Sequence, residues 1–371
     1  MWLLKDIKLF VFLSGKGQYL TTGRPCHSMY YERDPSALFL DTKIQHILKS
    51  MSQFQLHKIV RKEAVINNGT AYKLMTNVEL EEKFHDMIDS SRQMLQMAPV
   101  VQVNDGRNTV ISSDTILQGF SNTNFIVADV TYGFKNPLDK VLTRHTSGTL
   151  KYASLVTSKR IGQVYFPIIG RYVRVPNMFR NNELEKCLNE KKYEFILDRL
   201  SVQYEPYEKE YHEISGRVYM HINRSAGFED LRSTRHFGPM AFFLAWHKCI
   251  DDILYDMMKK RLLKNCVEII ALMYKLNSID EDYEDIFLQL RNLENCTIFQ
   301  INDIKNCCYT SQVSNRNDSN VKTECNNYLS QSVIFKTCTK FIDNYIKKYG
   351  IKKVQLKLAS NIFKEDNILL K

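Results

Sequence analysis

Residues 239–264 read PMAFFLAWHKCIDDILYDMMKKRLLK, and this stretch decides how the rest of the chain is interpreted. Its apolar residues recur every three or four positions, which is the spacing of one face of an α-helix. Pro239 suits the first turn of such a helix, and the positive charge of Lys259–Arg261 suits the negative end of its dipole. We therefore predict one long helix over Pro239–Lys264, which faces either the core or a second copy of the chain. The residues proposed for self-association are Phe243, Trp246, Ile250 and Leu254.

Helical spacing predicts further helices before and after this stretch. They cover Asp41–Ile59, with Asp41 as the cap, Asn77–Met97, Asn182–Leu200, Asp282–Leu293 and Tyr328–Tyr349. Short apolar runs bounded by Gly, Asn, Ser and Thr predict strands. The predicted strands are Lys8–Leu13, Phe125–Val130, Gln163–Ile169, Tyr172–Val175 and Gly216–Ile222. The fold class that we expect is mixed α+β, with several long amphipathic helices packed on short, mostly antiparallel strands and joined by long loops.

The length of 371 residues allows a substantial hydrophobic core, and we treat residues 1–371 as a single subunit. A tentative division separates an α/β part, residues 1–204, from a mainly helical part, residues 205–371. The second part contains a loop over residues 296–327 that is rich in Cys and Asn. No stretch approaches the roughly 18 apolar residues of a membrane span, and charges interrupt the N-terminal segment that has some character of a secretory signal. We expect a soluble, non-secreted protein without a membrane partner.

The net charge of +10 is concentrated between residues 133 and 180, where nine basic residues face one acidic residue, Asp139. The nine are Lys135, Lys140, Arg144, Lys151, Lys159, Arg160, Arg171, Arg174 and Arg180. Spaced basic residues interleaved with Tyr and Phe suit a phosphate backbone, because each neutralised phosphate releases a condensed counterion. Two interpretations stay open at equal weight: a nucleic-acid contact, and a solvated basic face that could also meet acidic patches on neighbouring subunits.

The sequence contains no recognisable catalytic set, and we predict neither an enzyme nor a metal or cofactor site. The pairs Arg144–His145 and Arg235–His236 could suggest strand-transfer chemistry, but the spacing that such a site needs is missing. The histidines form no His-Glu-x-x-His pattern, and the late cysteines fit no standard zinc module. We expect these cysteines to be free thiols, with disulfide pairing among them as the alternative. They are Cys296, Cys307, Cys308 and Cys325.

Two regions of the chain resemble the major capsid protein of baculoviruses, a family shared with nudiviruses. In the first, the Pro25-Cys26 step is followed by Tyr30 and Tyr31 with acidic neighbours, then by the short apolar run Ala37–Leu40 and the basic amphipathic segment Lys43–Lys49. In the second, Val218–Ala226 and Arg232–Ile253 are similar to a later strand, an Arg/Gly-containing loop and a helix of that family. Of the N-terminal cysteines that the family associates with zinc, only Cys26 matches, so no metal site is carried over.

The resemblance implies a structural virion protein, the main self-assembling subunit of a tubular nucleocapsid shell around double-stranded DNA. It also implies a homodimer within a helical or stacked-ring shell, viral DNA and minor capsid proteins as partners, and assembly in the host nucleus. The basic stretch within residues 133–180 would then face the DNA or bridge subunits. Two alternatives remain. The first is a soluble viral nucleic-acid-binding accessory or regulatory protein. The second is a nucleic-acid-processing enzyme that uses unrecognised Arg, His and Tyr residues, which loss of metal-dependent DNA turnover on mutating His145 or His236 would favour.

Overall fold

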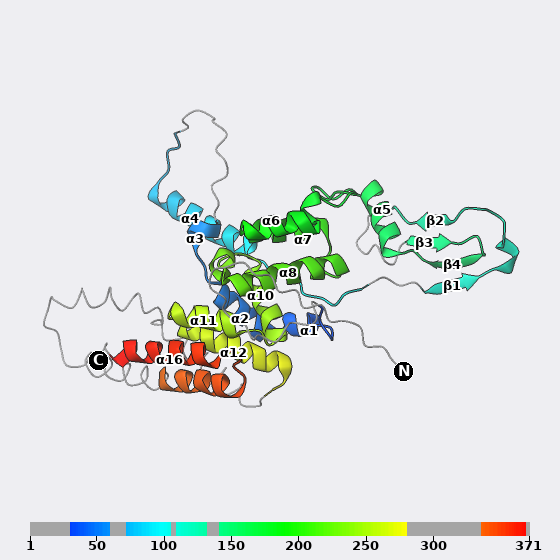
Figure 1. Ribbon diagram of the computed structural model, residues 1–371. Helices are drawn as coiled ribbons and strands as arrows, with labels where there is room; N and C mark the ends of the chain where they lie inside the picture. The colour runs from blue at the N-terminus through cyan, green and yellow to red at the C-terminus, as the bar shows by residue number, and fades with distance from the viewer. Residues whose placement is uncertain (1–29, 60–71, 105–108, 132–140, 280–334, 369–371) are drawn as a thin grey trace, which may run out of the picture.

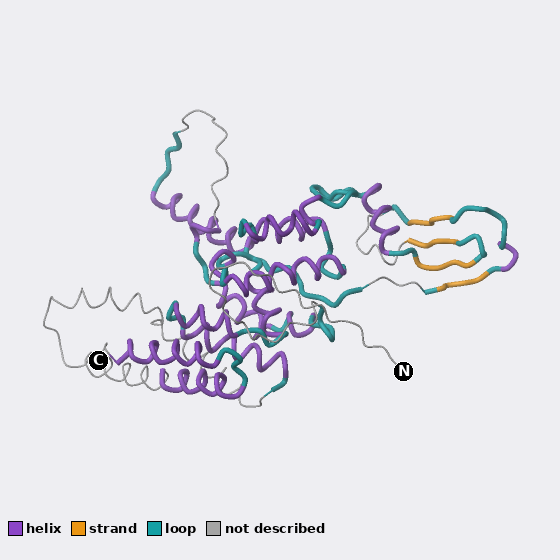
Figure 2. Tube along the Cα trace, viewed as in Figure 1, coloured by secondary structure: helices purple, strands orange, loops and turns teal. Residues whose placement is uncertain are grey.

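The computed structural model describes residues 30–59, 72–104, 109–131, 141–279 and 335–368. A body of packed helices makes up most of this part, and a small β-sheet projects from it (Figure 1). Figure 2 shows the strands of the described residues gathered in that projection. We call the four strands and the described residues between them the sheet arm, and the helices centred on α10 the helical body.

Helix α10, Phe237–Trp246, forms the centre of the helical body, because nine of its ten residues are buried. Helices α2, α8 and α12 pack around it. The core helices span α2 Thr42–Ser52, α6 Asn181–Asn189, α7 Tyr193–Gln203, α8 Lys209–Ser225, α11 Asp251–Lys259 and α12 Leu263–Asn277. Shorter or more peripheral elements are α1 Ser36–Phe39, α3 Leu56–Ile59, α4 Asn77–Met94, α5 Leu155–Tyr165, α9 Phe228–Leu231 and the 3-10 turns η1 Thr115–Leu117 and η2 Asn177–Phe179.

The single helix predicted over Pro239–Lys264 is wrong, because the stretch contains α10, α11 and the start of α12. The chain reverses between them at Lys248 and Arg261, whose φ angles of 56° and 60° are left-handed. A left-handed residue ends a helix even where the apolar spacing continues. The helix predicted over Asn182–Leu200 is divided in the same way, at Lys191.

The strand predicted over Gly216–Ile222 is also wrong, because these residues belong to helix α8. Their β-branched and aromatic side chains favour a strand locally. In the structure, however, the buried residues of α8 follow helical spacing, as Ile214, Val218, Tyr219 and Ile222 illustrate. The run Gln163–Ile169 starts inside α5, and Tyr172–Val175 is a loop, so neither forms the predicted strand. Packing against α7 and α10 overrides local propensity in α8, whereas residues 172–175 are exposed.

The predicted cap at Asp41 and the predicted helix start at Asn77 are, in contrast, both confirmed. Asp41 caps α2 by accepting a hydrogen bond from the backbone N–H of Lys43 at 3.0 Å. Helix α4 begins at Asn77, as predicted, behind a reciprocal capping box formed by Thr76 and Glu79. These signals depend on residues within one helical turn, which the sequence shows directly.

A C-terminal pair of helices, residues 335–348 and α16 Lys353–Ile368, packs against the body beside α11. One buried carboxylate, that of Asp251, joins the pair to the body. It accepts a hydrogen bond from the Tyr345 hydroxyl at 2.7 Å and from the backbone N–H groups of Ile351 at 2.7 Å and Lys352 at 2.9 Å. Asp251 is 6% exposed, so these contacts exclude water from the joint.

The sheet arm is antiparallel throughout, in the order β1-β4-β3-β2. The strands are β1 Val110–Ser113, β2 Phe125–Ala128, β3 Val141–Arg144 and β4 Thr149–Tyr152. At the start of the arm, the backbone N–H of Asn104 bonds the carbonyl of Tyr207 at 2.9 Å. At its end, Lys159 of α5 pairs with Glu208. Both ends of the arm are therefore anchored to the same short segment of the body.

The fold class is confirmed: the protein is mixed α+β, with amphipathic helices and a short antiparallel sheet. Within the described residues, no helix combines the length and the hydrophobicity needed to span a bilayer. The predicted segments Lys8–Leu13 and Asp282–Leu293 lie outside the described residues, as does the start of Tyr328–Tyr349. The division after residue 204 stays a prediction.

Replacing Gly148 with alanine should open the turn between β3 and β4. Gly148 has a φ of +79°, and an added Cβ would lie 2.0 Å from the backbone oxygen of Asp114. The left-handed conformation alone costs roughly 1–2 kcal/mol for an L-residue, and the backbone contact adds to it. Hydrogen exchange should therefore speed up at the amides of the sheet arm and stay unchanged in the helical body.

The matched control for that variant is Gly119→Ala. Gly119 has a similar φ of +75°, but no atom lies within 4 Å of the position of its added Cβ. The Gly119→Ala variant should therefore show only the free-energy cost of the left-handed backbone conformation. Equal exchange rates in the two variants would mean that the contact with Asp114 does not hold the turn.

Candidate nucleic-acid and protein interface

The basic residues predicted to form one surface are distributed over the sheet arm, α5 and the loop that follows it. Arg144 and Lys151 lie on β3 and β4, and both are partly buried. Arg160, Arg174 and Arg180 are exposed. Lys135 and Lys140 lie outside the described residues. The seven described members therefore lie on different elements and differ in exposure, and their role as one contact surface stays a prediction.

Lys159 and Arg171 are neutralised within the chain. Lys159 pairs with the carboxylate of Glu208, whose side chain is 1% exposed, and lies 5.9 Å from the centre of the Tyr204 ring. Burial raises the pKa of Glu208, and the contact with Lys159 only partly offsets this. Because the carboxylate lies so close, Lys159 has little charge to offer to a phosphate.

Arg171 fastens the loop after α5 to the end of α7. Its Nε donates to the Val202 carbonyl at 2.9 Å, and its Nη2 donates to Glu205 at 2.8 Å. The neighbouring Tyr172 exchanges two backbone–side-chain hydrogen bonds with Gln203, at 3.1 Å and 2.8 Å. Arg171 therefore has a structural role, which the sequence did not indicate.

The four residues proposed for self-association do not lie on one helix face. Phe243 and Trp246 belong to α10, Ile250 precedes α11, and Leu254 lies in α11. Phe243 is 2% exposed and both Ile250 and Leu254 are 0% exposed, so these three side chains fill the core of their own chain. Trp246 packs edge-on against Tyr31 with ring centres 5.3 Å apart. The burial of these side chains indicates that this stretch faces the core of its own chain rather than a second copy of the chain.

The pair Arg235–His236 forms a structural clamp on α7. His236 Nε2 lies 2.8 Å from Asp198 Oδ1, and the Arg235 guanidinium donates to the same oxygen at 2.8 Å and 3.1 Å. Burial alone would raise the pKa of Asp198, but these two partners outweigh it and lower the pKa. The group holds α7 to the start of α10, and Arg235 also donates a hydrogen bond to the Ser201 hydroxyl of α7 at 2.9 Å.

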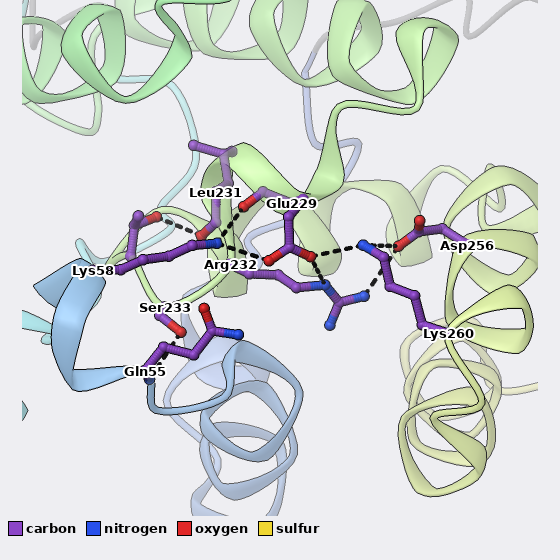
Figure 3. A network of polar contacts seen from close by, with 9 residues as sticks. Gln55, Lys58, Glu229, Leu231, Arg232, Ser233, Asp256 and Lys260 are labelled. Atoms are coloured by element: carbon purple, nitrogen blue, oxygen red, sulfur yellow. Dashed lines mark hydrogen bonds and ion pairs between the residues drawn. The ribbon is translucent and has the colours of Figure 1, made fainter. Parts of the chain in front are cut away.

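A second charged network, shown in Figure 3, surrounds the buried guanidinium of Arg232. Arg232 is 1% exposed; its Nη2 lies 3.2 Å from Asp256 and its Nε lies 3.4 Å from Glu229. Lys260 bridges the same two carboxylates at 2.7 Å and 3.1 Å, and Lys58 contacts Glu229 at 2.7 Å. Burial would raise the pKa of Glu229, but the two lysines lower it to about 2. The network joins α3, α9 and α11.

The cysteine cluster Cys296, Cys307, Cys308 and Cys325 lies outside the described residues, so its state stays a prediction. Among the described residues, no disulfide joins Cys187, Cys249, Cys266 or Cys338. Burial raises the pKa of Cys338 to about 11, which makes this thiol unreactive. Within the same part of the chain, no group of three His, Cys, Asp or Glu side chains is placed to hold a metal ion.

Residues 37–278 of the chain match the model of the family described as mitochondrial 28S ribosomal protein S22. The chain belongs to this family. Two relatives are each named small ribosomal subunit protein mS22. The protein from Bos taurus is 30% identical over 261 residues, which cover 69% of this chain and 73% of the relative. The protein from Mus musculus is 31% identical over 239 residues, which cover 64% and 67% respectively.

Membership in the S22 family overturns the resemblance to baculovirus and nudivirus capsid proteins. The predicted shell subunit, its viral DNA and minor capsid partners, and its place in a virion assembled in the host nucleus are therefore wrong. The alternative of a viral accessory protein is unsupported as well. The prediction that the chain is not an enzyme is confirmed, since the S22 family consists of ribosomal proteins, and this also removes the nucleic-acid-processing enzyme.

The capsid resemblance failed for a physical reason. Its second region required a strand at Val218–Ala226, where the S22 chain has the helix α8. Much of its first region precedes residue 37, where the match to the S22 family begins. The rest of the resemblance is a short series of common residue types in the same order along the chain. Proteins with different folds can share such a series.

Proposed function

We propose that this chain is a structural component of the small subunit of the mitochondrial ribosome. The observation that carries the proposal is the family match over residues 37–278, together with about 30% identity to two mS22 proteins. The matched range includes both α10, at the centre of the helical body, and the four strands of the sheet arm. A stable body with a projecting arm suits a protein that is fixed among several neighbours.

The second part of the proposal concerns the exposed basic residues and ribosomal RNA. Arg160 on α5, Arg174 in the loop that follows and Arg180 at the start of α6 are exposed, and we assign them to contacts with ribosomal RNA. Guanidinium groups bind phosphate oxygens in bidentate geometry, and such contacts position a protein without reading the base sequence. Lys159 and Arg171 are left out of this assignment because carboxylates of the chain already neutralise them.

Sedimentation of mitochondrial extracts tests the proposal. An epitope-tagged chain should migrate with the small ribosomal subunit on a sucrose gradient, both in intact ribosomes and after the subunits are separated at low Mg²⁺. Depletion of the chain should reduce small subunits while large subunits persist. A tagged chain that stays at the top of the gradient, or follows the large subunit, would show that the proposal is wrong.

A further inference from the structure

One face of the sheet arm is apolar and open to solvent. In an antiparallel sheet, residues directly opposite each other lie on the same face. The register pairs Phe125 with Arg144 and Arg144 with Leu150; it also pairs Val127 with Leu142 and Leu142 with Tyr152. We call this the apolar face, and its side chains are Phe125, Val127, Leu142, Arg144, Leu150 and Tyr152.

The two faces of the arm differ in composition and in how they are covered beside residue 141. The opposite face carries Thr143, Thr149 and Lys151 beside its exposed apolar residues Val110 (62%) and Ile126 (49%), and it is closed at Val141, which is 0% exposed, and at Ala153, next to β4, which is 2% exposed. On the apolar face, Phe125 is 48% exposed and Val127 is 55% exposed, while Leu142, Leu150 and Tyr152 are only partly buried. A contiguous apolar surface of this kind is unfavourable in water and is typical of a binding surface.

Arg144 is the only charged residue on the apolar face. Among the described residues it has no ion pair, and its Nη1 is buried without a hydrogen-bond partner. A ribosomal RNA backbone would require several cations on one face, and this face offers one. A protein surface with apolar side chains and one acceptor suits it better, because interface cores are depleted in charge and enriched in aromatic residues and Arg.

We propose that the apolar face of the sheet arm docks onto another protein of the small subunit. The partner presents an apolar patch with one carboxylate or backbone carbonyl opposite Arg144. This inference rests on the proposed function, since the partner is a component of the same particle. It goes further by assigning this face of the arm to protein, whereas the exposed residues Arg160, Arg174 and Arg180 are assigned to RNA.

Two adjacent residues of β2 provide a matched test. Val127 lies on the apolar face and Ile126 on the opposite face, with exposed fractions of 55% and 49%. Each is changed to glutamate, and incorporation into small subunits is measured in competition with the wild-type chain. We expect Val127→Glu to reduce incorporation roughly tenfold or more, which corresponds to about 1.4 kcal/mol of docking free energy. Ile126→Glu should stay within about twofold of wild type, and both variants should keep the thermal unfolding temperature of the helical body.

A photoreactive benzoylphenylalanine at position 125 identifies what covers the face. In purified small subunits, we expect it to form a cross-link to another protein. A cross-link to RNA or to the chain itself would overturn the docking proposal, as would equal incorporation of the Val127 and Ile126 variants. Absence of the wild-type chain from small subunits would instead overturn the proposed function, and the docking proposal with it.

Discussion

Changing Arg232 to methionine should lower the free energy of unfolding by roughly 3 kcal/mol, the lower end of the range for breaking a buried ion pair. The guanidinium is 1% exposed and faces the carboxylate of Asp256, which is itself only 14% exposed. Without Arg232, the carboxylates of Asp256 and Glu229 have less positive charge around them. The loss stays at the lower end because Lys260 still contacts both Glu229 and Asp256. Urea unfolding at neutral pH, followed by circular dichroism, measures the change.

Arg217→Met is the control for this variant. Arg217 also forms an ion pair, with Glu185 at 2.8 Å, but the two side chains are 28% and 58% exposed. A pair that is open to solvent contributes about 1 kcal/mol or less. If both variants lose the same stability, burial of the Arg232 network does not determine its contribution.

Asp251→Ala should have a comparable or larger effect, roughly 3–5 kcal/mol, and should detach the C-terminal pair of helices. The change leaves the Tyr345 hydroxyl and two backbone N–H groups without their acceptor. Each buried polar group that loses its partner costs about 1–3 kcal/mol. Because all three lie at one joint, residues 335–368 should become sensitive to limited proteolysis before the helical body unfolds.

The neighbouring residue provides the control for Asp251. Asp252 forms an ion pair with Lys352, and these side chains are 28% and 24% exposed. Asp252→Ala should cost about 1 kcal/mol or less and leave the protease resistance of the C-terminal pair intact. Rapid cleavage of the Asp252 variant, with a resistant Asp251 variant, would contradict this account of the joint.

The sequence predicted the features that depend on neighbouring residues. Asp41 was identified as a cap because its partner, the N–H of Lys43, lies two positions away. The breaks at Lys191, Lys248 and Arg261 could not be predicted in this way. Lysine and arginine rarely adopt a left-handed φ, so only the packing of the helices on either side makes those turns favourable.

The same limit applies to the candidate interface. The sequence showed an excess of positive charge but not which charges stay available, since Arg171 meets Glu205 only after the chain has passed through two helices. The apolar face of the sheet arm depends on register, which pairs β2 with β3 and β3 with β4. The sequence did contain one indication of this face, because the run Phe125–Ala128 is apolar at every position. A strand that is buried on one face only needs apolar residues at alternate positions.

The anchoring of both ends of the sheet arm to one segment makes the arm a modular insertion. The chain leaves the body where Asn104 bonds Tyr207 and returns where Lys159 pairs with Glu208. A longer or shorter arm would therefore change only the entropy of closing a loop, which grows slowly with loop length. The packing around α10 would not have to change. Evolution can thus adjust how far this protein reaches toward its neighbours without altering the stability of the body that holds it.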